Sequence, residues 1–359
     1  MRIGATAASP FPCQSSYTNQ TRYRLKRRAF LTQSTLGVCS LSMSGKASAE
    51  LSPTDLRPTR PIGQAEPSRP ITKDNVARCR VANPRAVKIL QCTDVHLHCD
   101  RDRHGDKADQ LTREDIKRLV DKHQPDLIAF TGDVWHDPAP GKSEEIFSDA
   151  LSLMIEMDTP WLFNWGNHDL LEDYGQAQAA LTEAPKSLYR GGYAAGNYRI
   201  LLENNNKVPL HELVCLNTTT QGVQAPQEAW LKQVITLANR PKQALCFLHI
   251  PIQQYIDVWK AGSAKGVKHE DVCTYGEDGS AFALLKKLGV TACFCGHDHV
   301  NDYTGTHDGI AMVYGRATGH AGYGGDRLRK GGKLITLDTT SGRHTWQTVF
   351  ANGKTWVPS

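Results

Sequence analysis

The strongest constraint on this chain is a repeated arrangement in which a short apolar run ends at a carboxylate, amide or imidazole. Asp94, Asp133, Asn167, His249 and His297 each stand at or just beyond the carboxyl end of such a run. Because the loops at the carboxyl ends of strands converge at one edge of an open α/β sheet, these five side chains should meet there. One such coincidence would carry little weight, but five in one chain predict a site.

The spacing of the apolar runs indicates the fold class. From residue 85 onward, short apolar runs alternate with amphipathic segments, which predicts an α/β fold, and the closing runs lack helices between them, which indicates mixed sheets. The predicted strands are 86–94, 127–133, 161–166, 198–203, 212–217, 244–249, 291–295, 310–314 and 333–337. The predicted helices are 113–123, 143–157, 175–182, 227–238 and 280–288.

The polar residues fall into five short motifs. They read Asp-Val-His at 94–96, Gly-Asp at 132–133, Gly-Asn-His-Asp at 166–169, His-Ile-Pro at 249–251 and Gly-His-Asp-His at 296–299. In an extended segment residues i and i+2 share a face, so the two side chains of each Asp-x-His or His-x-His pair can border one site. We expect the glycines that precede Asp133, Asn167 and His297 to allow tight turns and a close approach of the backbone to a bound anion.

These motifs, in this order, resemble the calcineurin-like metallophosphoesterase superfamily, and the resemblance covers nearly all of residues 86–340. Two further segments resemble a subgroup related to purple acid phosphatases: Gly-His-Asp-His-Val-Asn-Asp-Tyr at 296–303 and Tyr-Gly-Arg-Ala-Thr-Gly at 314–319. The resemblance implies a four-layer αββα sandwich of two mixed β-sheets flanked by helices, with two metals at one edge.

The resemblance also implies a set of metal ligands. One metal would be held by Asp94, His96 and His299. The other would be held by Asn167, His249 and His297, and Asp133 would bridge the two. Mixed imidazole and carboxylate ligands suit Fe, Zn or Mn rather than Ca or Mg. Two such ions can bind a phosphoryl oxygen and supply a bridging hydroxide as the nucleophile.

Two residues beside these ligands are given supporting roles by the same resemblance. His168 would be the general acid or a clamp for phosphate, and Asp169 would orient a neighbouring imidazole. Purple acid phosphatases carry a metal-bound tyrosine three residues after the bridging aspartate, but His136 occupies that position here. The purple colour should therefore be absent, and a ferric ion is less strongly favoured.

Several other residues keep two interpretations. His98 and His136 lie near the predicted site but outside the shared motifs, and Arg316 and His320 belong either to a substrate pocket or to a solvated loop. Tryptophans 135, 161 and 165 are expected in the core or in a pocket wall rather than as a stacking platform. The remaining histidines are expected at the surface: His104, His123, His211, His269, His307 and His344.

The first 49 residues are interpreted as an export signal. Arg27 and Arg28 precede a short, weakly apolar run, and Ala47-Ser-Ala49 offers a cleavage site, which is typical of the twin-arginine route. A disordered basic tail is the alternative. Residues 50–84, rich in Pro, Arg, Ser and Thr, are expected to form a linker or extended arm before a catalytic domain at 85–359. The mature protein is expected in the periplasm or outside the cell, and the export machinery is its expected partner.

Charge and cysteine usage bear on the partners and the compartment. The net charge is +5, but residues 1–49 hold seven basic and no acidic residues, so the rest of the chain is about −2. That balance does not suggest a surface that binds nucleic acid.

No apolar run reaches the roughly 18 residues of a membrane span. Cysteines 92, 215, 246, 293 and 295 lie within apolar runs, so we expect mostly free, buried thiols.

The preferred function is an exported phosphomonoesterase that acts on a small phosphorylated substrate. A phosphodiesterase or nuclease on the same scaffold is the first alternative, and the negative balance of the mature chain disfavours a polynucleotide substrate. A non-catalytic binding protein with a relict site is the second alternative. The presence of every expected site residue argues against it.

Overall fold

The computed structural model describes residues 75–101, 105–218 and 220–359. Six α-helices are found in these residues, in chain order α2 (Lys107–His123), α3 (Ser143–Glu156), α4 (Tyr174–Glu183), α5 (Ala225–Ile235), α6 (Gln254–Lys260) and α7 (Ser280–Leu288). A 3₁₀ turn, η3, spans Gly191–Tyr193. The helix ends follow local chemistry: the Asp173 carboxylate caps α4 by accepting two backbone N–H groups, and α7 ends at Gly289 in the left-handed conformation.

The first sheet has six strands in the order β14-β13-β12-β2-β3-β4. Strands β2, β3 and β4 run parallel, and β12, β13 and β14 join by antiparallel pairing, so the sheet is mixed. The bounds are β2 (Val87–Cys92), β3 (Leu127–Thr131), β4 (Trp161–Asn164), β12 (Gly332–Leu337), β13 (His344–Val349) and β14 (Thr355–Trp356).

The second sheet has eight strands in the order β1-β5-β6-β7-β9-β11-β10-β8. Its centre, β6-β7-β9-β11, is parallel, whereas β5 pairs antiparallel with β6, and β10 pairs antiparallel with β11 and β8. The bounds are β1 (Val76–Arg80), β5 (Tyr198–Glu203), β6 (Pro209–Cys215), β7 (Ala244–Phe247), β8 (Lys265–Lys268), β9 (Val290–Cys295), β10 (Asn301–His307) and β11 (Ile310–Tyr314).

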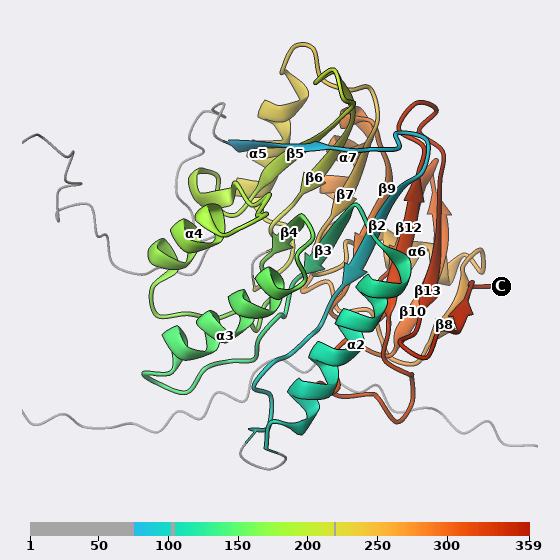
Figure 1. Cartoon of the computed structure of the whole chain (residues 1–359). Helices are drawn as coiled ribbons and strands as arrows, with labels where there is room; N and C mark the ends of the chain where they lie inside the picture. The colour runs from blue at the N-terminus through green and yellow to red at the C-terminus, as the bar shows by residue number, and fades with distance from the viewer. Residues whose placement is uncertain (1–74, 102–104, 219) are drawn as a thin grey trace, which may run out of the picture. The chain divides into compact units, whose positions relative to one another are not determined.

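Alternate residues of the second sheet separate two hydrophobic cores. In β7, Leu245 and Phe247 pack with the first sheet and helices α2, α3 and α4, whereas Ala244 and Cys246 pack with α5, α6 and α7. This period of two follows from the pleat of a strand. Figure 1 shows α2 and α3 against the six-stranded sheet. The result is the predicted four-layer αββα arrangement of two mixed sheets flanked by helices.

The elements absent from the sequence prediction are short, polar or peripheral. Strands β1, β8 and β14 are edge strands, β10 and β13 are largely polar, and α6 has only seven residues. Residues 76–80, assigned above to the linker or extended arm, form strand β1, with Ala77 and Cys79 buried between exposed arginines. The folded domain therefore begins before residue 85. The proposed signal at 1–49 lies outside the described residues.

Buried side chains settle several of the remaining expectations. Cys92, Cys215, Cys246, Cys293 and Cys295 are free and buried, as expected, and burial raises the pKa of the Cys92 thiol to about 12. The three tryptophans 135, 161 and 165 are buried in the core, as expected. His211 was expected at the surface but is fully buried in β6. Among the described helices, none is both long and apolar enough to cross a membrane.

Candidate metal centre

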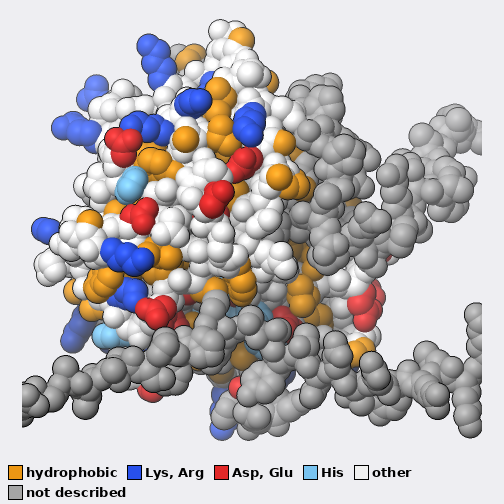
Figure 2. Space-filling model, turned by 180° about the vertical axis from the view of Figure 1, so that it is seen from behind, with side chains coloured by type: hydrophobic (Ala, Val, Ile, Leu, Met, Phe, Trp, Pro, Cys, Tyr) orange, Lys and Arg blue, Asp and Glu red, His pale blue; other side chains and the backbone are white. Residues whose placement is uncertain are grey.

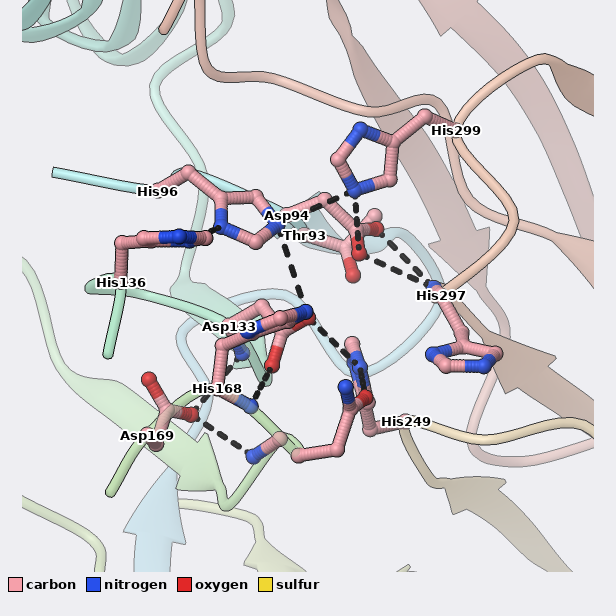
Figure 3. Close-up of polar contacts among 12 residues, drawn as sticks. Thr93, Asp94, His96, Asp133, His136, His168, Asp169, His249, His297 and His299 are labelled. Carbon is pink, nitrogen blue, oxygen red and sulfur yellow. Dashed lines mark hydrogen bonds and ion pairs between the residues drawn. The ribbon is translucent and has the colours of Figure 1, made fainter. Parts of the chain in front are cut away.

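The predicted ligands lie at the carboxyl ends of strands from both sheets. Asp94 and His96 follow β2, Asp133 follows β3 and Asn167 follows β4, whereas His249 follows β7 and His297 and His299 follow β9. The two sheets therefore deliver their loops to a common edge. Figure 3 shows Asp94, His96, Asp133, His249, His297 and His299 around a common centre.

Asp94, His96 and His299 form one compact set of donor atoms, here called group one. One ligand atom from each lies within 4.8 Å of the others, and all three residues are buried. The Nε2 atoms of His96 and His299 are 3.0 Å apart, and His299 Nε2 lies 3.4 Å from Asp94 Oδ1.

Asp133, His249 and His297 form a second set within the same limit of 4.8 Å, here called group two. His249 Nε2 is 3.2 Å from Asp133 Oδ2 and 3.0 Å from Asn167 Oδ1. The Asp133 Oδ2 atom is also 3.5 Å from His96 Nε2, so this carboxylate lies beside both groups. Group one coincides with the first predicted ligand set, and group two contains His249 and His297 of the second set together with Asp133, with Asn167 beside it. The binding of metal by these groups stays a prediction.

Backbone carbonyls orient two of the imidazoles. His249 Nδ1 donates to the carbonyl of Thr131 at 2.9 Å, and His299 Nδ1 donates to the carbonyl of Tyr323 at 3.2 Å. With Nδ1 protonated, each ring turns the lone pair of Nε2 toward its group. Buried imidazoles and carboxylates that converge in this way fit a borderline transition-metal ion such as Fe, Zn or Mn.

The carboxylates of the two groups remain ionised although they are buried. Burial opposes the ionisation of Asp94, but the neighbouring His299 and His249 outweigh it and hold the pKa of Asp94 below its usual range. Asp133 is affected in the same way: burial opposes ionisation, and His249 and His168 hold the pKa well below its usual range. Burial and the proximity of His249 lower the pKa of His297 to about 3, so its imidazole is neutral.

Four predicted ligands have a left-handed backbone. The φ angles are 52° at Asp94, 49° at His96, 51° at Asp133 and 79° at His297. This region is sparsely populated by residues other than glycine, although Asp, Asn and His enter it more readily than most. Such strain concentrates at functional sites, where the surrounding structure enforces it.

The glycines beside the ligands leave room for protein side chains. A Cβ atom at Gly132 would lie 2.5 Å from the ring of His249, one at Gly166 would overlap the carboxylate of Asp133, and one at Gly296 would overlap Thr93. We expected these glycines to let the backbone approach a bound anion. The described contacts show that they let predicted ligands and their neighbours pack against the backbone, and the approach to an anion stays a prediction.

Asp169 holds backbone rather than an imidazole, so its predicted role is wrong. Its two carboxylate oxygens accept hydrogen bonds from the N–H groups of Asp133, Val134, Trp135 and Gly166 at 2.7–3.1 Å. The sequence places Asp169 in a histidine-rich motif, which suggests an imidazole partner. The tight turn after β3 presents three N–H groups instead, and a buried carboxylate satisfies them.

His168 lies at the more exposed side of the site. Its backbone N–H donates to Asp133 Oδ1 at 2.8 Å, and its ring centroid is 5.2 Å from that of His96. Nδ1 contacts Asp137 Oδ1 at 2.9 Å, which leaves Nε2 unused by this pair. Burial disfavours the charged imidazole, but the hydrogen bond to Asp137 and the charge of Asp133 outweigh it and raise the pKa of His168 to about 9.

The histidines left open in the sequence analysis lie beside the groups without joining them. His136 Nδ1 is 3.2 Å from Nδ1 of His96, on the other side of that ring from Nε2, and the His136 ring stacks on His168 with centroids 4.8 Å apart. His98 Nε2 contacts Asp149 at 2.8 Å. Neither side chain belongs to the two sets of converging donor atoms.

Arg316 and His320 are engaged with the protein. Arg316 is buried, and its Nε donates to Asp302 Oδ2 at 2.7 Å. His320 Nε2 contacts Asp115 of α2 at 2.9 Å. Neither the pocket nor the solvated-loop interpretation describes Arg316, because an arginine in a glycine-rich stretch gives no sign of its buried carboxylate partner.

Sequence reasoning missed two residues that contact the site. Asp137 contacts His168, and Tyr323 stacks on His299 with ring centroids 3.9 Å apart. Asp137 stands four residues after Asp133, so proximity to a predicted ligand could have identified it. Tyr323 lies between two glycines 24 residues after His299, and only the folded chain brings it to that ring.

Comparisons with known proteins agree with this arrangement. Residues 87–301 match the family model described as calcineurin-like phosphoesterase. The chain is 27% identical over 316 residues to "Probable inactive purple acid phosphatase 28" of Arabidopsis thaliana, which covers 75% of this chain and 79% of the plant protein. It is 28% identical over 276 residues to "Phosphatase DCR2" of Saccharomyces cerevisiae, covering 64% of this chain and 47% of the yeast protein.

Further matches are more distant. "Tartrate-resistant acid phosphatase type 5" of Mus musculus is 26% identical over 230 residues, covering 56% of this chain and 63% of the mouse protein. Among solved structures, purple acid phosphatase PPD1 from yellow lupin (Lupinus luteus) is similar with a TM-score of 0.47 and 12% identity, covering 76% of this chain and 52% of the lupin chain.

Proposed function

Since the chain belongs to the calcineurin-like phosphoesterase family, we propose that it is an exported phosphatase with a dinuclear metal centre, which hydrolyses phosphate monoesters. The observation that carries this proposal is the position of Asp133. Its Oδ2 lies 3.5 Å from His96 of group one and 3.2 Å from His249 of group two. A carboxylate shared in this way can hold two cations close together.

Group one would hold one ion, and group two together with Asn167 would hold the other. When bound, two transition-metal ions supply Lewis-acid activation of a phosphoryl oxygen and of water, and neutralise the charge of the transition state. The chain itself orients the imidazoles, excludes bulk water from the buried groups and fixes the backbone of Asp133 through Asp169.

His168 is the proposed proton donor. Asp137 engages Nδ1, so Nε2 is the nitrogen available to a substrate. A proton delivered from Nε2 to the ester oxygen assists departure of an alcohol with a high pKa. The same nitrogen could instead only bind a phosphoryl oxygen, and the leaving-group experiment in the Discussion separates these roles.

Two other functions are tested beside this one. A nuclease needs a basic surface for its polyanionic substrate, but the chain after residue 49 has a net charge of about −2. Figure 2 shows acidic as well as basic side chains on one face of the molecule. A binding protein with a relict site would have lost ligands, whereas this chain retains all seven predicted metal ligands and His168. Two Arabidopsis relatives are named as probably inactive, so the binding-protein alternative has to be tested as well.

The decisive experiment combines metal analysis with two substrates. The purified protein should contain about two transition-metal ions per chain, hydrolyse p-nitrophenyl phosphate faster than bis(p-nitrophenyl) phosphate, and lose activity to a chelator. Faster hydrolysis of the bis ester would favour the diesterase. Two bound ions without hydrolysis of either ester would favour the binding protein, and a folded protein that takes up no metal would refute the whole proposal.

Export through the twin-arginine route is a separate proposal that rests on the sequence. Replacing Arg27 and Arg28 by Lys should leave a folded precursor in the cytoplasm, because the receptor recognises the arginine pair. The mature chain should begin near Glu50. Unchanged export of the double variant would refute the twin-arginine assignment and leave secretion by another route open.

A further inference from the structure

Tyr323, on the loop between β11 and β12, contacts His299 in three ways, and the function proposed above makes no use of it. The two rings stack with centroids 3.9 Å apart and planes 10° apart. His299 Nδ1 donates to the Tyr323 carbonyl at 3.2 Å, and the His299 backbone N–H donates to the Tyr323 hydroxyl at 3.3 Å. One residue thus holds both the ring and the backbone of a predicted ligand.

The glycines on either side of Tyr323 permit this contact. A Cβ atom at Gly322 would lie 2.9 Å from Cε1 of His299 and 3.1 Å from Cδ2 of His96, closer than ordinary contacts. Gly324 has a φ of 84°, and a Cβ atom there would overlap Val300. The loop therefore lies directly on the two imidazoles of group one because it has no side chain at either position.

Two charged residues fix Tyr323 in place. Its hydroxyl donates to the carboxylate of Glu270, with both oxygens at 3.0 Å, and Glu270 Oε1 also accepts the N–H of Val300 at 2.9 Å. On the other side, Nζ of the buried Lys330 donates to the Tyr323 carbonyl at 2.7 Å. Tyr323, Glu270 and Lys330 are called the Tyr323 clasp below.

The two groups differ in what orients their imidazoles. In group two, His249 is held by the carbonyl of Thr131, which belongs to the buried strand β3. In group one, His299 depends on a loop residue that is 48% exposed. Local opening of an exposed loop costs less free energy than opening of a core strand. The orientation of His299 is therefore the more easily disturbed of the two.

We propose that Tyr323 is a positioning residue that sets the affinity of group one for its metal ion, while group two is independent of it. The inference rests on the proposed dinuclear function. Hydrogen-bond partners that orient a ligating imidazole are typically worth 10- to 100-fold in metal affinity. Opening the Tyr323 clasp should therefore release one ion per chain and retain the other.

Zinc titration of the metal-free full chain, followed by calorimetry, tests this directly. The wild-type chain should bind two ions. Tyr323→Ala keeps the backbone carbonyl but removes the stacked ring and the hydroxyl that hold it against His299, and should weaken one of the two binding events 10- to 100-fold. Both variants keep the carbonyl, but Tyr323→Phe also keeps the stacked ring, so its loss of zinc affinity should be smaller. Arg327→Gln, at an exposed position of the same loop, is the matched control and should bind like wild type.

A double variant identifies which group is affected. His299→Ala should abolish the group-one event, and adding Tyr323→Ala to it should cause no further loss, because Tyr323 acts through His299. Additive losses would place the effect elsewhere and overturn the inference, as would unchanged zinc affinity in Tyr323→Ala. If Tyr323→Ala fails to fold, the Tyr323→Phe titration decides. A folded wild-type chain that binds none of zinc, iron and manganese would instead refute the proposed function.

Discussion

Asp169 holds the backbone of Asp133: its Oδ2 accepts the Asp133 N–H at 2.8 Å. The same oxygen accepts the N–H of Gly166, and Oδ1 accepts those of Val134 and Trp135. The turns after β3 and β4 are thus joined through one buried carboxylate. The predicted bridging ligand owes its position to this contact.

The substitution Asp169→Asn should destabilise the protein. Whichever way the amide lies, its NH₂ group faces two buried N–H donors that have lost their acceptor, and each such loss costs about 1–3 kcal/mol. Urea unfolding should report a loss of at least about 2 kcal/mol. Glu172→Gln, which affects an exposed carboxylate that accepts one backbone N–H, is the control and should change little. A fully stable Asp169→Asn would show that the turn does not need the carboxylate.

Asp133→Asn should remove metal and activity together. Asparagine tolerates the left-handed backbone at this position, so the substitution tests charge rather than strain. Without the negative charge beside both groups, the repulsion between two cations is no longer offset. Elemental analysis should give fewer than two ions per chain, with hydrolysis reduced to background. Retention of both ions would mean that Asp133 does not bridge them.

His168→Ala should separate the proton donor from the ligands. We expect both ions to stay bound, because the His168 side chain contacts Asp137 and belongs to neither group. The kcat should fall by about 10²–10⁴ for esters with poor leaving groups and less for p-nitrophenyl phosphate. Equal losses for both classes of ester would show that His168 binds phosphate without donating a proton. Loss of metal would show that it is a ligand.

His211 should make stability depend on pH. Burial lowers its pKa to about 4 in the folded chain, whereas the pKa of histidine in an unfolded chain is about 6.5. Between these two pH values the unfolded chain therefore binds more protons than the folded chain. The free energy of unfolding is highest above about pH 6.5 and falls by about 3 kcal/mol in total as the pH drops toward 4. His211→Gln should flatten the curve between these limits in denaturant unfolding at several pH values. His269→Gln, at an exposed position, should leave it unchanged.

The iron-loaded protein should lack the strong visible band of an iron–tyrosinate pair. His136, which stands where purple acid phosphatases carry the tyrosine ligand, contacts His96 on the side away from group one. An absorption spectrum after loading with iron checks this. A purple preparation would mean that another tyrosine reaches the metal.

The sequence predicted the fold where hydrophobic periodicity and chain order agree. Strands β5 and β11 and helix α7 have their predicted bounds, because each is an apolar or amphipathic segment between clear turns. The edge strands β1, β8 and β14 were missed, since an edge needs few apolar residues: β8 reads Lys-Gly-Val-Lys. Strand β10 was missed because its polar Asp302 is buried against Lys333 and Arg316, a pairing that only the folded chain reveals.

The site shows the same division. The ligands could be predicted because strand ends fix where Asp94, Asp133 and His249 lie, whatever the loops do. The residues that orient the ligands could not be predicted. Tyr323 contacts His299 from a loop 24 positions away in the sequence, and the carboxylate of Asp169 accepts backbone N–H groups rather than an imidazole. A backbone N–H or carbonyl is present at nearly every position, so the sequence does not show which of them a distant side chain will contact.

The left-handed backbone at four predicted ligands limits how this centre can be re-engineered. A designer who wished to change metal preference would replace histidine or aspartate by cysteine, glutamate or a β-branched residue. At Asp94, His96, Asp133 and His297 each such replacement would also have to adopt a φ between 49° and 79°. Few residues besides Gly, Asn, Asp and His do so readily. The main-chain conformation therefore limits which ligands can be exchanged. His249 and His299 do not have a left-handed backbone, so substitutions should begin at these two positions.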